Sequence, residues 1–183
     1  MEVTPYIMGG KAADVNETPW VVSIHGNGSH ICGGFLIDAT TLVTAGHCFP
    51  RPIRYSVEIN RGMPSAEMID LNLTSVHEEY NHETRNDVAI AKLMKPANIS
   101  SYATLGTTNA TGSLAHVAGW GVETRDGSPT KTLKSLDVSV LDTPKCEQLP
   151  TFDPSIMICA AANSTESKHL KTKLLTFSCV RGR

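Results

Sequence analysis

Short apolar segments follow one another closely along this chain, and turn residues separate them. One run covers residues 20–24 and leads into the turn Gly26-Asn27-Gly28, and further runs follow at 31–37 and 42–45. Other segments alternate apolar and polar residues, which is the period of a strand with one buried face. No helical pattern longer than about three turns precedes residue 163. These signals predict an all-β fold.

The apolar segments fall into two groups. The first group ends with Val88–Leu93, a nearly continuous apolar run that predicts a strand covered on both faces. Residues 98–113 are mostly small and form a linker to the second group. There we expect strands at 114–118, 136–140 and 156–159.

Composition excludes several classes of protein. The chain has 183 residues, 40% of them hydrophobic, with 14 Gly and 10 Pro, so collagen-like and wholly disordered chains are excluded. No apolar run reaches the roughly 18 residues of a membrane span. The formal charge of −2 gives no basic footprint for nucleic acid. We therefore expect neither nucleic acid nor a membrane as a partner.

The C-terminal segment has a different charge from the rest. Residues 1–162 contain 11 Lys and Arg against 17 Asp and Glu, whereas residues 163–183 contain 5 against 1. We interpret 163–183 as a basic, disordered tail, with a weak helix over 168–180 as the alternative.

Six of the nine asparagines begin an Asn-X-Ser/Thr sequence, where chance predicts about two. These glycosylation candidates are Asn16, Asn27, Asn72, Asn98, Asn109 and Asn163. An accidental match on a Thr-rich surface is the alternative. Glycosylation indicates an oxidising secretory route and a secreted, extracellular protein.

The first six residues have no apolar region of a signal peptide, so we expect a leader that was removed or a reading that begins late.

Two residues stand where catalytic chemistry is expected. His47 follows the apolar run 42–45 and is joined directly to Cys48, which would fix its position; a core hydrogen-bonding role is the alternative. Asp87 heads the apolar run 88–93, where an unpaired buried carboxylate is costly. A histidine ring N–H is a suitable partner, and in that pairing the carboxylate fixes the tautomer of a histidine base. A turn residue is the alternative for Asp87.

Six segments together resemble the trypsin/chymotrypsin family of serine endopeptidases. They occur in the family's order and cover about residues 7–160. The segments are Ile7-Met8-Gly9-Gly10, His30 to Ile37, Thr44-Ala45-Gly46-His47-Cys48, Asn86-Asp87-Val88-Ala89, Ala118-Gly119-Trp120-Gly121 and Met157-Ile158-Cys159-Ala160. One departure is Gly46, where alanine is usual.

The resemblance implies a two-barrel chymotrypsin-like fold. The first barrel would be complete and span 7–105, and a partial second barrel would span 113–162, followed by the tail 163–183. Ile7 would be the mature N-terminus. No cofactor and no metal is implied, and the expected partners are protein or peptide substrates or inhibitors, with the oligomeric state left open.

The resemblance also implies the site residues. His47 would be the general base and acid, and Asp87 the orienting carboxylate. Disulfides would join Cys32 to Cys48 and Cys146 to Cys159, each stabilising the fold by roughly 3 kcal/mol. Cys179 is left without an implied partner.

The family's nucleophile segment, Gly-Asp-Ser-Gly-Gly, does not follow Cys159 in this sequence. Ser178 has no neighbouring glycine and is not expected to replace it. The residue before Ile7 is Tyr6, where such zymogens usually have Arg or Lys. We therefore expect an inactive, truncated product of a protease gene. The alternative is a non-catalytic homologue that binds proteins as a decoy or regulator.

The histidines near residue 80 offer a further candidate for a metal site. His77 and His82 lie among Glu78, Glu79 and Glu83, but their spacing matches no established metal site. A solvated acidic loop is the favoured interpretation.

Overall fold

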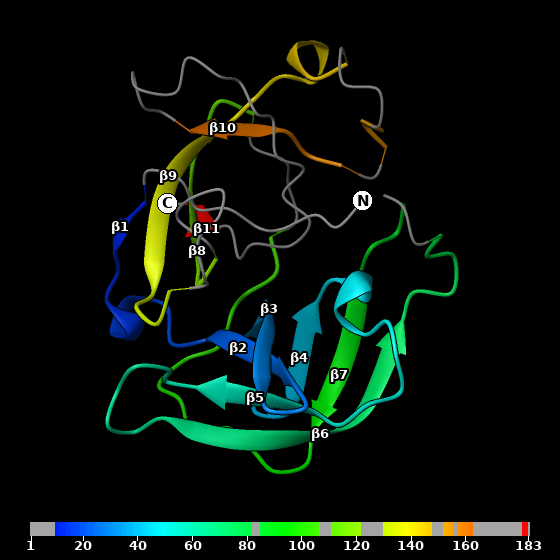
Figure 1. Cartoon of the computed structure of the whole chain (residues 1–183). Coiled ribbons are helices and arrows are strands. Elements are labelled where there is room, and N and C mark those ends of the chain that lie inside the picture. Colours follow the sequence, from blue (N-terminus) through cyan, green and yellow to red (C-terminus); the bar gives the residue numbers. More distant parts are fainter. Residues whose placement is uncertain are drawn as a thin grey trace.

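Six strands of the first half close into a barrel, which occupies the lower part of Figure 1. The computed structural model of the chain describes residues 10–81, 85–106, 111–121, 130–147, 152–155, 157–162 and 181–182. Around the barrel the strands are β2 (Val21–Gly26), β3 (Ser29–Leu36), β4 (Thr41–Thr44), β7 (Ala89–Leu93), β6 (Glu67–Val76) and β5 (Tyr55–Ile59). All neighbouring pairs are antiparallel. Closure leaves this sheet without a free edge.

The core of the barrel comes from the inward residues of these strands. Ile24, Leu36, Leu42 and Val57 are fully buried and pack in one cluster with their neighbours. Asn27 and Gly28 connect β2 to β3 with positive φ angles of 49° and 83°. That combination is typical of the two-residue turns whose twist matches a hairpin.

The strand at the end of the first half differs from its prediction. We expected Val88–Leu93 to be covered on both faces, but β7 alternates between the two environments. Ala89, Ala91 and Leu93 are buried, whereas Ile90 is 46% exposed. The prediction was wrong because continuous apolarity does not distinguish a strand buried on both faces from a barrel strand with an apolar residue outside.

The second half forms a sheet that is not closed in the described residues. Its strands are β1 (Lys11–Ala12), β9 (Lys134–Val140), β8 (Leu114–Gly119), β11 (Arg181–Gly182) and β10 (Ala160–Ala162), which pairs with β9. The last expected strand, 156–159, was placed too early. The observed strand begins at Ala160, where backbone pairing with Val140 starts.

A small apolar cluster joins the barrel to the second sheet. Val15 lies in the short helix η1 (Val15–Glu17), and it packs with Val21, Trp120 and Leu133. The guanidinium of Arg61 lies 5.8 Å from the centre of the Trp120 ring, a cation–π contact across the same junction. Two further short helices are η2 (Gly46–Cys48) and η3 (Thr143–Lys145).

Several predictions fall outside the described residues. These are the proposed mature N-terminus Ile7, the residues His82, Glu83, Asn109, Asn163, Ser178 and Cys179, and most of the tail, 163–180 and 183. Among the residues described, no helix has the length and apolar character needed to cross a membrane.

Shortening Leu42, a core residue of β4, should destabilise the barrel far more than shortening Ile90, which is partly exposed on the neighbouring strand β7. We expect Leu42→Ala to lower the free energy of unfolding by about 2–5 kcal/mol, because it leaves a cavity among fully buried side chains. Ile90→Ala, on the adjacent β7, is the control and should change it by less than about 0.5 kcal/mol, as is usual for surface positions. Urea unfolding measures both. Equal losses would contradict the assignment of the core.

Candidate active site

The register between β4 and β7 brings together two residues that lie forty positions apart in the sequence. Thr44, the last residue of β4, is paired with Ala89, the first residue of β7. His47 lies three residues after Thr44, and Asp87 lies two residues before Ala89. Both are therefore held at the same end of the barrel by a ladder of backbone hydrogen bonds.

Asp87 uses both carboxylate oxygens to hold His47. Nδ1 of His47 lies 2.7 Å from Oδ2, and the backbone N–H of His47 donates to Oδ1 at 2.8 Å. The Asp87 side chain is only 7% exposed, whereas that of His47 is 45% exposed. The buried carboxylate thus fixes a half-exposed ring through its Nδ1 side.

The carboxylate stays ionised despite its burial. Burial alone would raise the pKa of Asp87, but the hydrogen bonds donated by the His47 ring and backbone and by the Gly46 backbone outweigh it. The pKa of Asp87 is therefore lowered. A negative charge at this position is what stabilises a histidine that takes up a proton.

Gly46 leaves room for this approach. A Cβ at this position would lie 2.9 Å from Cγ1 of Val76, 3.2 Å from Cδ1 of Tyr80 and 3.3 Å from Oδ1 of Asp87. A side chain here would therefore meet Val76 first, and then Tyr80 and the carboxylate of Asp87. Burial, followed by the charge of Asp87, raises the pKa of Tyr80 in this corner.

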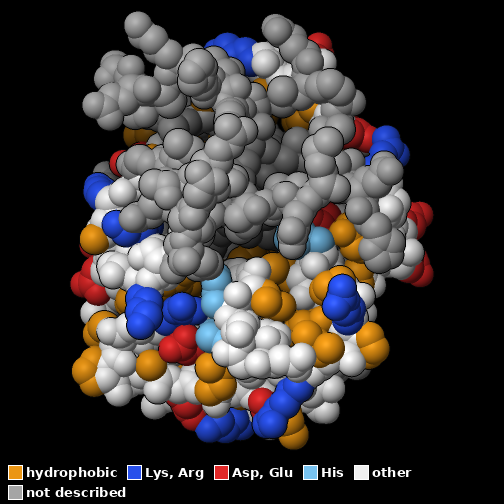
Figure 2. Space-filling model, viewed as in Figure 1, with side chains coloured by type: hydrophobic (Ala, Val, Ile, Leu, Met, Phe, Trp, Pro, Cys, Tyr) orange, Lys and Arg blue, Asp and Glu red, His pale blue; other side chains and the backbone are white. Residues whose placement is uncertain are grey.

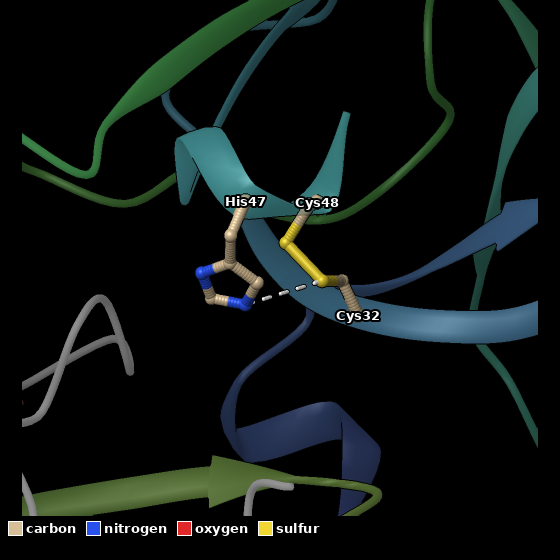
Figure 3. Close-up of side chains that lie close together, drawn as sticks. All are labelled: Cys32, His47 and Cys48. Carbon is tan, nitrogen blue, oxygen red and sulfur yellow. Dashed lines mark hydrogen bonds between the residues drawn. A yellow bond between two sulfur atoms is a disulfide. The ribbon is translucent and has the colours of Figure 1, made fainter. Parts of the chain in front are cut away.

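A disulfide fixes the segment that carries His47. Cys48 in η2 is joined to Cys32 in β3, and the His47 ring projects beside the bond (Figure 3). Nε2 of His47 lies 3.9 Å from the sulfur of Cys32. Cys32, His47 and Cys48 are close enough to hold a metal ion, but the two sulfurs are bonded to each other and offer no thiolate.

The remaining candidate residues lie elsewhere. Cys146 and Cys159 form a second disulfide, which joins the residue after η3 to the residue before β10. Asn16, Asn27, Asn72 and Asn98 are all exposed on or beside the first barrel. His77, Glu78 and Glu79 lie on the surface, where the Glu79 backbone N–H donates to Nδ1 of His77.

A buried polar network on the barrel was not predicted from the sequence. Ser23 is fully buried, and its Oγ lies 2.9 Å from Nε2 of His25 and 2.7 Å from Nδ1 of His30. Arg61 donates to the same Oγ at 2.6 Å, and Glu58 lies 3.1 Å from Nε2 of His25. The residues come from β2, β3, β5 and the turn after β5, so no short motif unites them. The only sequence signal was two histidines close to a tight turn.

This network strongly disfavours a charged His30. Burial, followed by the positive charge of Arg61 and the proximity of His25, lowers the pKa of His30 from 6.5 to about 4. A neutral ring is consistent with Arg61 lying in the same network. The unfolded chain therefore takes up a proton at His30 at a higher pH than the folded chain does.

Replacing His30 with glutamine should flatten the pH dependence of stability between about pH 6.5 and pH 4. In the wild type, stability falls as the pH drops through this window, because protons then bind preferentially to the unfolded state. Urea unfolding at pH 7 and pH 5 measures the difference. His77→Gln, which changes an exposed histidine, is the control and should keep the wild-type slope. An unchanged slope in His30→Gln would overturn the assignment.

Comparison with known proteins places this geometry in a family. The sequence profile named Trypsin matches residues 7–169. The chain is 32% identical to the venom peptide isomerase heavy chain of Agelenopsis aperta, over 88% of this chain and 78% of that protein. It is 31% identical to trypsin beta of Drosophila erecta, over 88% and 69% respectively. The chain belongs to the trypsin family of serine proteases.

The fold comparison agrees with the sequence comparison. Neuropsin, a serine protease expressed in the limbic system of mouse brain, superposes with a TM-score of 0.80 at 23% identity. The match covers 96% of this chain and 82% of that one. The closed barrel with its second, partial sheet is thus the chymotrypsin-like fold. Relatives also include transmembrane protease serine 11E of Mus musculus, at 33% identity, of which the chain spans 40%.

Proposed function

We propose that this chain carries the proton-transfer half of a trypsin-family serine endopeptidase site. His47 is the general base and acid, and Asp87 is the carboxylate that orients it. The observation that supports the proposal is the contact of 2.7 Å between Nδ1 of His47 and Oδ2 of Asp87, with the ring half exposed.

The chemistry follows from the tautomer. When Nδ1–H donates to Asp87, the lone pair of Nε2 faces outward and accepts the proton of a serine hydroxyl as that oxygen attacks a peptide carbonyl. The protonated ring then gives the proton to the leaving amine. Asp87 stabilises the imidazolium during the step and does not itself take the proton.

The second part of the proposal concerns the 183-residue chain taken by itself. No Gly-Asp-Ser-Gly-Gly segment follows Cys159 in its sequence, so it has no serine in the family's nucleophile motif. Loss of a triad nucleophile lowers turnover by about 10⁶. These 183 residues by themselves are therefore proposed to be inactive.

Several further properties belong to the same proposal. The substrates or inhibitors of the parent enzyme are proteins or peptides, which is the kind of partner that trypsin-like proteases have. The protein is secreted, which the two disulfides and the six Asn-X-Ser/Thr sequences support. Ile7 is the mature N-terminus, and the two units span 7–105 and 113–162.

Nitrogen NMR of the histidine rings tests the assignment of the base. On the neutral ring of His47 we expect the proton on Nδ1, which donates to Asp87, and none on Nε2. Asp87→Asn should reverse the two, because the amide N–H donates to Nδ1 and leaves the proton on Nε2. His116, on β8, is the internal control and should not change. A wild-type His47 with its proton on Nε2 would contradict the proposal.

A fluorophosphonate probe tests the second part. The folded 183-residue chain should show no labelling, because the probe needs an activated serine. An active trypsin-family enzyme in the same reaction is the control for the reagent. Stoichiometric labelling of the chain would show that another serine has taken the role, and peptide mapping would then identify it.

A further inference from the structure

Asn27 stands at the tip of the β2–β3 hairpin in a sequence that accepts N-linked sugar. The sequence is Asn27-Gly28-Ser29, and all three residues are exposed. Asn27 has a φ of 49°, which holds it in the left-handed turn region. Glycosylation at Asn-X-Ser/Thr occurs in surface segments such as this turn.

Two exposed apolar side chains lie at the base of the same turn. Ile31 is 39% exposed and Ile53 is 38% exposed. They converge on Gly26, because a Cβ on that glycine would lie 3.0 Å from Cδ1 of Ile53 and 3.2 Å from Cδ1 of Ile31. The backbone N–H of Asn27 donates to the carbonyl of Arg54 at 3.1 Å. The turn is therefore attached to the 53–54 segment beside this apolar pair.

The hairpin tip lies toward the end of the barrel that carries His47. Leu36, at the end of β3, pairs with Leu42, near the start of β4, so the start of β3 points toward the end of β4. His47 follows the end of β4. Asn98 lies at the opposite end, because the preceding Ala97 donates its N–H to the carbonyl of Ala39, before β4 begins.

Each of the other described Asn-X-Ser/Thr sequences lacks at least one feature of the Asn27 site. The side-chain amide of Asn16 donates to Asp14 at 2.8 Å, and Asn72 lies within β6 rather than in a turn. Hydrophobic side chains are visible over the described surface of the barrel in Figure 2. Ile31 and Ile53 are exposed hydrophobic side chains that lie against Gly26, at the base of the turn that carries Asn27.

We propose that Asn27 carries an N-linked oligosaccharide that covers Ile31 and Ile53 at the His47 end of the barrel. The sugar is bulky and polar, and it shields apolar surface that would otherwise attract other chains. It also borders the approach to His47 for large proteins. The proposal rests on the secretory route proposed above.

The modification is a transfer from a lipid diphosphate oligosaccharide. Nδ2 of Asn27 forms a bond to C1 of the first sugar as the bond between C1 and the diphosphate oxygen breaks. The amide releases one proton to the solvent, and the lipid diphosphate leaves as the anion with the bonding electrons. No oxidant or reductant is involved.

The experiment compares the full chain with two variants after expression in a secretory host. Ser29→Ala removes the acceptor sequence at Asn27 but keeps the asparagine that the turn requires. Ser100→Ala is the matched control, because it removes the acceptor sequence of Asn98 at the opposite end. Mass spectrometry after enzymatic release of glycans gives the occupancy of each asparagine. Hydroxyl-radical labelling of the intact, folded proteins reports the exposure of Ile31 and Ile53.

We expect Asn27 to be occupied in the wild type. Ser29→Ala should raise the labelling of Ile31 and Ile53 roughly twofold, because a bulky glycan no longer blocks them. Ser100→Ala should leave both unchanged. If Ser29→Ala is not secreted, enzymatic removal of glycans from the folded wild type gives the same comparison.

Four results would overturn the proposal in different ways. An empty Asn27 beside an occupied Asn98 excludes this site but leaves the secretory route intact. A chain that reaches the medium with no occupied asparagine excludes glycosylation altogether, and retention inside the host, without glycan, contradicts the secretory route itself. Occupancy of Asn27 with unchanged labelling of Ile31 and Ile53 excludes the covering role.

Discussion

The pairing of β4 with β7 is the interaction on which the candidate site depends. It sets Thr44 opposite Ala89 and so delivers His47 and Asp87 to one end of the barrel. A buried carboxylate needs hydrogen-bond partners. Asp87 obtains them from the ring and the backbone N–H of His47. The site therefore assembles as the barrel folds. When β4 and β7 pair in this register, the Asp87 carboxylate is buried and also receives its hydrogen bonds.

The barrel contains a second cluster of buried polar groups that bond to one another, centred on Ser23. Around Ser23 the donors and acceptors come from four segments, and the hydroxyl of one small residue contacts two imidazoles and a guanidinium. Arg61 then extends the network to the ring of Trp120, the residue that follows β8. The two polar clusters differ in consequence. The Asp87 carboxylate stays negatively charged beside a half-exposed histidine, because its pKa is lowered. The His30 ring stays neutral, because its pKa is lowered as well.

The all-β class and the contact between His47 and Asp87 could be predicted from the sequence, because apolar alternation is a local signal and a buried carboxylate needs a partner. Apolar alternation marked the strands, and an acidic residue before an apolar run marked Asp87. Local signals were insufficient in three places. Ile90 faces outward although its neighbours suggested a covered strand, the last strand begins at Ala160 rather than at 156, and the network of Ser23, His25 and Arg61 forms only through strand pairing. Each of these is decided by register, which one segment alone does not encode.

The position of β1 has a consequence for how the chain acquires its structure during synthesis. Lys11 and Ala12 pair with Ser135 and Lys134 of β9, so the first described strand finds its partner only after more than a hundred further residues have been made. The barrel, whose last strand ends at Leu93, is complete well before then. An emerging chain thus holds a closed first unit and an unpaired strand that waits for the second. β1 is therefore paired only after β9 has been made, which ties this strand to completion of the second sheet.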